Sequence, residues 1–197
     1  MQKLEVLSVA GISSVTNEFV SELLAYLGCD LKEISLADCG KLNDSALEAI
    51  TDVCCALNVL ILDNLFLLTD TALVHLANGC RSFQTLSLKR CSFSDESVVA
   101  FINASGNCLS DLSLNNVKKV ANQTILALVS NTHETLLRLD ISWCRNLTDE
   151  ALELLADSSS FLRELIFFDC TQVTDKFFEG HSNALLEVTG VNHQFLQ

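Results

Sequence analysis

The sequence predicts an open α/β solenoid of about seven repeats, each about 26 residues long. An apolar triplet with the spacing Leu-x-x-Leu-x-Leu recurs along the whole chain. Each triplet is followed by an Asp or Asn and then by apolar residues at helical spacing. The chain contains no proline, so nothing interrupts a strand or a short helix. We therefore expect parallel strands on a concave face and helices on a convex face.

The apolar triplets define the repeats. They begin at Leu4, Leu31, Leu57, Phe83, Leu109, Leu136 and Leu162. Alternating apolar residues are typical of a strand with one buried face. We expect a single domain over residues 1–197, closed by a segment at 182–197 that contains a partial last strand. The apolar, uncapped start at Leu4 leads us to expect that this domain is the C-terminal part of a longer protein.

A helix is expected after each triplet, at a recurring Asp or Asn. The expected starts are Asn17, Asp44, Asp70, Asp95, Asn122, Asp149 and Asp175. The side-chain oxygen of such a residue accepts a hydrogen bond from a first-turn N–H, and its charge suits a helix N-terminus. The seventh helix is expected to be short, because Gly180 and His181 interrupt its apolar spacing.

Four of the nine cysteines follow the repeat. They are Cys39, Cys91, Cys144 and Cys170, each in the turn that leaves a strand. We expect them to be a row of reduced, buried thiols, which favours the nucleus or the cytoplasm. The cysteines and histidines show no metal-ligand spacing, so we expect no metal and no cofactor.

Composition restricts the function to binding. The formal net charge of −13 disfavours direct nucleic-acid binding by this segment. The leucine-rich stretch at 59–77 contains Asp63 and Asp70, so it does not predict a membrane span. We recognise no phosphate-binding loop and no nucleophile with a base beside it. The sequence therefore predicts a protein that is not an enzyme.

Residues 136–156 follow the unit Leu-x-x-Leu-x-Leu-x-x-Cys-x-x-Leu-Thr-Asp-x-Ala-Leu-x-x-Leu-Ala almost throughout. This unit resembles the cysteine-containing leucine-rich repeats, best known from F-box substrate receptors of cullin-type ubiquitin ligases. Residues 169–183 and 188–190 resemble the C-terminal end of fungal leucine-rich-repeat subunits of global-genome nucleotide-excision repair. The second resemblance implies nuclear localisation. It also implies a Swi/Snf-type ATPase and an elongin C and cullin ligase module as partners.

Aromatic residues gather on the later strands of the expected concave face. Trp143 and Phe168 lie in adjacent repeats, with Ile166 beside them in the strand. Exposed aromatic side chains dominate many protein interfaces, so these residues are candidates for a partner-binding anchor. In the alternative interpretation, Trp143 only packs along the strand edge.

Charged residues also lie on the expected concave face, at the strand positions that alternate with the apolar triplet and at the residues that follow each strand. Lys89, Arg90 and Arg138 are candidates for contact with acidic side chains of a partner. Asp63 and Asp140 lie in neighbouring repeats, and mutual pairing of these opposite charges is the interpretation we favour.

We therefore expect a protein-binding horseshoe that serves a cullin-type ubiquitin ligase in nucleotide-excision repair. Two alternatives remain open: an F-box-type substrate receptor for other targets, and a stoichiometric inhibitor or regulator of another protein.

Overall fold

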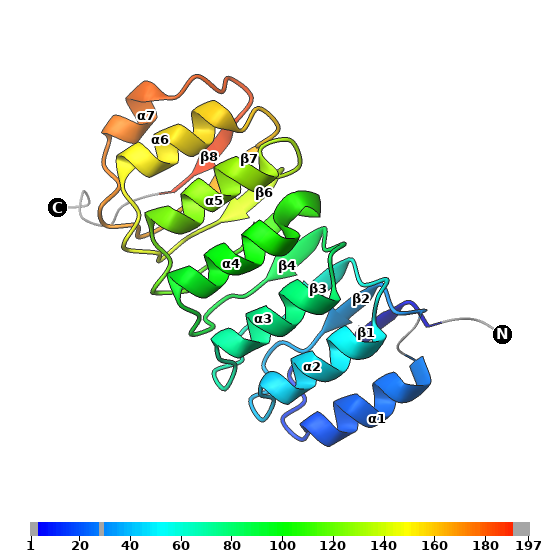
Figure 1. Cartoon of the computed structure of the whole chain (residues 1–197). Coiled ribbons are helices and arrows are strands. Elements are labelled where there is room, and N and C mark those ends of the chain that lie inside the picture. The colour runs from blue at the N-terminus through cyan, green and yellow to red at the C-terminus, as the bar shows by residue number, and fades with distance from the viewer. Residues whose placement is uncertain (1–3, 28–29, 191–197) are drawn as a thin grey trace.

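The computed structural model describes residues 4–27 and 30–190, which form one parallel sheet covered by helices on one face (Figure 1). Strand order follows the chain from β1 to β8. The central residue of each strand pairs with the central residue of the next, as Ile34 does with Leu60. Successive helices lie side by side along the stack (Figure 1). The predicted solenoid of parallel strands and helices is confirmed.

Each strand is three residues long. The strands are β1 Val6–Ser8, β2 Glu33–Ser35, β3 Val59–Ile61, β4 Thr85–Ser87, β5 Asp111–Ser113, β6 Arg138–Asp140, β7 Glu164–Ile166 and β8 Glu187–Thr189. The helices are α1 Asn17–Leu27, α2 Asp44–Val53, α3 Asp70–Gly79, α4 Asp95–Ser105, α5 Asn122–Thr132, α6 Asp149–Ser158 and α7 Lys176–Gly180. A short 3-10 helix, η2 Gly106–Cys108, follows α4.

The first six helices begin at the Asp or Asn that the sequence marks. The seventh begins at Lys176, one residue after Asp175, and is five residues long, so the expectation of a short last helix is confirmed. The structural role of this Asp or Asn differs from the helix-capping role that we expected. Where a side chain caps its own helix, it comes from the preceding residue: Asn43, Thr69 and Ser94 each accept a first-turn N–H.

The helix-start Asp instead ties one repeat to the next. The carboxylate of Asp149 accepts hydrogen bonds from the N–H and the hydroxyl of Thr174, at 2.7 and 2.6 Å. The prediction that Asp149 caps its own helix is therefore wrong, because the neighbouring loop presents unpaired donors to it. The same contact recurs in other repeats, where a side-chain oxygen accepts a hydrogen bond from a backbone N–H of the next repeat. The acceptor and donor residues are Asp44 and Thr69, Asp70 and Ser94, Asp95 and Ala121, and Asn122 and Thr148.

The core lies between the sheet and the helices. The central residues of β2 to β7, such as Leu60 and Leu139, are fully buried. The predicted cysteine row is buried too, and each thiol donates to a carbonyl of the preceding repeat. These bonds run from Cys39 to Val9, from Cys91 to Leu62, from Cys144 to Leu114, and from Cys170 to Ile141. These cysteines are therefore structural hydrogen-bond donors.

The C-terminal end of the stack carries one further strand. In β8, Val188 pairs with Leu165 of β7, which agrees with the expected partial strand. The closing segment was expected to reach residue 197, and residues 191–197 lie outside the described part. Within residues 4–27 and 30–190, no helix is long and apolar enough to cross a membrane.

Candidate partner-binding surface

The chain turns sharply after each of the strands β1 to β7, through a residue in the left-handed conformation. These residues are Gly11, Asp38, Asn64, Arg90, Asn116, Trp143 and Asp169. Gly, Asn and Asp adopt positive φ most readily, whereas bulky side chains do so at a cost. Arg90 at φ 58° and Trp143 at φ 66° depart from that preference. Such departures point to side chains that serve something other than the local fold.

Trp143 is 42% exposed. The Arg145 guanidinium lies 5.4 Å from the centre of its ring, and Arg145 also forms an ion pair with Asp169. The backbone N–H of Trp143 donates to the backbone carbonyl of Phe168 at 2.7 Å, and the Phe168 residue is 37% exposed. The described part of the chain shows no ring contact between Trp143 and Phe168. They are therefore two neighbouring exposed aromatic residues and not one stacked pair.

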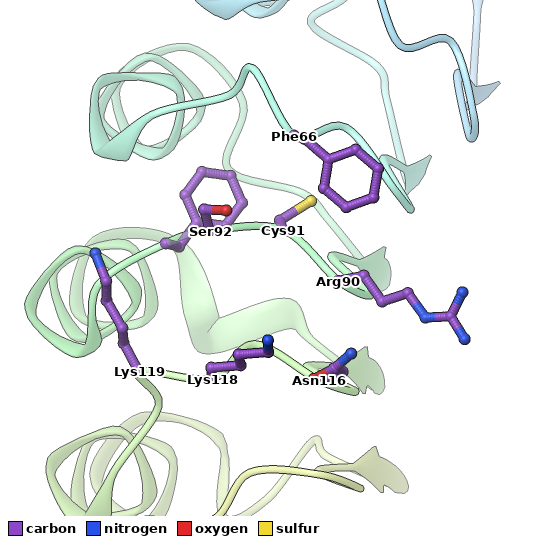
Figure 2. A pocket seen from close by; sticks show the side chains of 8 residues that line it. Phe66, Arg90, Cys91, Ser92, Asn116, Lys118 and Lys119 are labelled. Carbon is purple, nitrogen blue, oxygen red and sulfur yellow. The ribbon is translucent and has the colours of Figure 1, made fainter.

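Two hollows adjoin each other along the loops that follow β3, β4, β5 and β6. The first has a volume of about 270 Å³ and lies between three consecutive loops (Figure 2). It is lined by Phe66, Arg90, Cys91, Ser92, Phe93, Asn116, Lys118 and Lys119. The second, of about 390 Å³, is lined by Asn116, Lys118, Trp143 and Arg145. Because Asn116 and Lys118 line both, the two hollows form one continuous surface.

We call this surface the basic edge. It comprises Phe66, Arg90, Asn116, Lys118, Lys119, Trp143 and Arg145. Of these residues, the sequence marked only Arg90 and Trp143 as candidates, because they lie at predicted concave-face positions. Phe66, Lys118 and Arg145 each stand two residues after a left-handed residue, so tabulating that loop position would have revealed them.

The two candidate carboxylates, Asp63 and Asp140, are engaged in hydrogen bonds. Asp63 accepts hydrogen bonds from the Ser87 hydroxyl and from the backbone N–H of Lys89, at 2.5 and 3.0 Å. Asp140, which is buried, accepts a bond from Asn115 at 3.2 Å. The favoured pairing of Asp63 and Asp140 with Lys89, Arg90 and Arg138 is therefore wrong, because both carboxylates accept hydrogen bonds from polar neighbours and Arg138 pairs elsewhere. Within residues 4–27 and 30–190, Lys89 and Arg90 form no ion pair.

Arg138 has internal partners. Its guanidinium on β6 bonds to Glu164 of β7 at 2.8 Å and to Asp111 of β5 at 3.3 Å. This three-strand ladder neutralises its charge. Ile166, the third residue of β7, is partly exposed on the concave face between Asp140 and Thr189. The predicted site residues thus divide into exposed side chains near the basic edge and charged groups that are held within the sheet.

The surface carries no arrangement typical of catalysis. Cys91 borders the first hollow, but its thiol donates to the Leu62 carbonyl, and burial raises its pKa to about 12. A thiol with such a pKa is a poor nucleophile at neutral pH. In the described part of the chain, no three His, Cys, Asp or Glu side chains gather as metal ligands.

Comparison with known proteins places the chain in a family. The family model described as Leucine Rich repeat matches residues 132–156, which contain the most regular repeat. The chain is a leucine-rich-repeat protein. Its cysteine row and open parallel sheet extend the same pattern over the other repeats.

Two of its relatives are fungal DNA-repair proteins. DNA repair protein rhp7 of Schizosaccharomyces pombe is 32% identical over 152 residues, 75% of this chain and 27% of the relative. DNA repair protein RAD7 of Saccharomyces cerevisiae is 25% identical over 170 residues, 82% of this chain and 30% of the relative. The chain spans roughly 30% of the length of each. The expected resemblance to fungal repair subunits is confirmed.

Another relative has a different name. Antagonist of mitotic exit network protein 1 of Eremothecium gossypii is 29% identical over 147 residues, 73% of this chain and 37% of that protein. Among solved structures, the Rad7 and Elc1 complex of yeast matches with a TM-score of 0.65 and 18% identity. That match covers 89% of this chain and 58% of the other, and it shows a shared fold.

Proposed function

We propose that this chain is the partner-binding leucine-rich-repeat part of a Rad7-type protein that serves a cullin-type ubiquitin ligase in nucleotide-excision repair. The observation that carries the proposal is the 32% identity to rhp7 over 152 residues. Similarity to RAD7 and the fold shared with Rad7 in its complex with Elc1 support it. An Elc1-type adaptor with its cullin and a Swi/Snf-type ATPase are the proposed partners, and the nucleus is the proposed compartment.

The proposed role is binding without catalysis. Trp143, Phe168 and Ile166 offer apolar surface on the later strands and their exits. Lys89 and Arg90 add positive charge two repeats before Trp143, after β4. Arg138, Asp63 and Asp140 act differently in this proposal: their internal bonds fix the strands and turns that carry the contact residues. A rigid repeat scaffold with exposed loops is well suited to holding another protein.

The test is affinity capture of the tagged full-length protein from its own cells, before and after ultraviolet irradiation, with quantitative mass spectrometry. We expect an Elc1-type adaptor with a cullin, or a Swi/Snf-type ATPase, to be enriched over an untagged control. Recovery of neither group under either condition would overturn the proposal.

A second candidate function is stoichiometric regulation of another protein. It is favoured by the 29% identity to a protein named as an antagonist of the mitotic exit network. The same capture separates the two functions, because a regulator would recover one abundant partner in an equimolar amount without ligase subunits. Loss of that partner's activity upon addition of the purified protein would then establish regulation.

A further inference from the structure

We propose that the basic edge binds an acidic, extended segment of a partner protein that carries an apolar side chain. The inference rests on the proposed function only in taking a protein as the partner. It assigns the contact surface and the chemistry of the bound segment.

The surface has the shape for an extended segment. Phe66 stands at one end of the paired hollows and is 62% exposed, and Trp143 stands at the other end. In Figure 2, Lys118 lies beside Asn116, and Lys119 extends from its loop toward the neighbouring one. Adjacent strands of a sheet are about 4.8 Å apart, so four consecutive loops span about 15 Å. A few extended residues cross that distance.

Three of the four loops that form this surface are basic in an otherwise acidic chain, and the fourth, after β3, contributes Phe66. Residues 88–94, 114–121 and 141–148 hold five of the twelve Lys and Arg residues and no Asp or Glu. The equivalent loops of the first three repeats, 9–16, 36–43 and 62–69, hold one Lys and two Asp. The positive charge is therefore local to the loops after β4, β5 and β6, where it attracts acidic side chains of a partner.

The cations of this surface are available to a partner. Arg90 and Lys118 form no ion pair within residues 4–27 and 30–190. Lys119 is electrostatically coupled to Asp70, but that carboxylate already accepts bonds from the Ser94 N–H and the Ser97 hydroxyl, both at 2.8 Å. Among the described residues, Arg145 is the one cation of this surface with an internal ion pair, which it forms with Asp169. Carboxylates of a bound segment would meet Arg90 and Lys118 as exposed side chains without an ion pair, which favours binding.

An acidic peptide suits this surface better than a nucleic acid. The exposed rings at both ends match apolar side chains, which a peptide supplies between its carboxylates. A nucleic acid carries phosphates along its whole length, and those beyond the basic edge would meet a surface dominated by the chain's 25 Asp and Glu residues. A short acidic segment keeps its charge within the basic loops.

The test uses fluorescence anisotropy with the full chain and a labelled synthetic peptide in which Glu alternates with Phe and Leu. The peptide is about ten residues long, which reaches about 33 Å when extended. Two further probes have the same length: a peptide with Gln in place of Glu, and a single-stranded oligonucleotide. We expect the Glu peptide to bind at least about tenfold tighter than either, and to weaken as salt is added.

Charge-reversal variants locate the contact. Lys118→Glu is expected to weaken binding of the Glu peptide about tenfold or more. The matched control is Arg81→Glu, which makes the same change of charge at an exposed site on the opposite edge, after α3. Phe66→Ala tests the apolar part against Phe161→Ala, because Phe161 is 48% exposed between α6 and β7. Melting temperatures of all four variants check that the fold is intact.

Several results would overturn the assignment. They are no binding of the Glu peptide, equal binding of the Gln peptide, tighter binding of the oligonucleotide, and equal losses in Lys118→Glu and Arg81→Glu. Each would remove this surface assignment and leave the proposed function standing, because that function depends on which ligase or repair proteins are captured.

Discussion

The first three repeats and the next three share a backbone but use it differently. At the left-handed turn, the first three carry Gly11, Asp38 and Asn64, which suit positive φ. The next three carry Arg90, Asn116 and Trp143, of which only Asn suits it. Two residues after the left-handed residue, the third repeat carries the aromatic Phe66. At the same position, the fifth and sixth repeats carry the basic residues Lys118 and Arg145.

The difference separates folding from binding at equivalent positions. Both regions have buried central strand residues such as Leu60 and Leu112, and in both a helix-start Asp bonds to the next repeat. The exposed loop side chains are what changes. A position where the residue is unfavourable for the local backbone, in a stack whose other copies follow the preference, is therefore a good marker of a binding surface.

Truncation of a buried strand residue should have the largest effect on stability, and it tests whether the two regions share one core. Leu60 and Leu139 are equivalent, fully buried strand residues. Leu60→Ala and Leu139→Ala should each lower the free energy of unfolding by about 3 kcal/mol, through lost burial and the cavity left behind. Urea denaturation followed by circular dichroism measures both. Costs that differ by more than about 2 kcal/mol would mean that the two regions pack differently.

The next effect tests the bond between repeats. Asp149 is buried and Asp44 is only partly buried, although each holds a Thr of the following repeat. Asp149→Ala should therefore cost about 2 kcal/mol and Asp44→Ala about 1 kcal/mol, because the donors left unpaired by the first are shielded from water. Denaturation of the two variants gives the ranking. Equal costs would contradict it, and Asp149→Asn should recover part of the loss.

A smaller effect tests the turn preference directly. Trp143→Asn should raise the stability of the fold by about 0.5 kcal/mol, because Asn tolerates positive φ, and should weaken partner binding. Asn64→Ala should lower stability by about 1 kcal/mol at the equivalent turn. Thermal melting measures both. Destabilisation by Trp143→Asn would show that the indole stabilises the fold, as in the alternative interpretation of Trp143.

The smallest effect concerns the thiols, which run through both regions. Burial raises the pKa of Cys91 to about 12, from an ordinary value of 9.0. The unfolded chain therefore releases this proton first, so the stability is complete below pH 9 and falls as pH rises from 9 toward 12. At pH 9 the loss is about 0.4 kcal/mol for one thiol.

The measurement compares the wild type with Cys91→Ala at pH 7 and pH 9. The stability difference between the two proteins should narrow by about 0.4 kcal/mol at pH 9, because only the wild type loses this contribution. An unchanged difference would contradict the raised pKa. In the native protein, the exposed Cys55 and Cys108 should react with a thiol reagent while Cys91 and Cys144 do not.

Sequence periodicity predicted the strands and the helix starts, because each depends on local spacing. It did not predict which donors Asp149 would bond to, since the loop carrying Thr174 is brought beside it only by stacking. The cysteine turn was predicted correctly because a thiol is small and apolar and recurs with the repeat.

The binding surface was only partly predictable. Trp143 and Arg90 each stand at the turn that follows a predicted strand, so the repeat spacing of the sequence was enough to identify them as candidates. Lys118 and Phe66 lie in loops, where exposure and proximity depend on how consecutive loops settle against each other. The pairing of Asp63 and Asp140 with Lys and Arg side chains was mispredicted. The sequence shows the opposite charges, but it does not show that Ser87 and Asn115 donate hydrogen bonds to these carboxylates.

Hydrogen–deuterium exchange with and without the Glu peptide tests most directly whether partner contact lies in the loops of repeats four to six. We expect slower exchange in residues 88–94, 114–121 and 141–148, with no change in residues 9–16 and 36–43. Protection of the first two loops, or protection confined to the helices, would contradict this expectation.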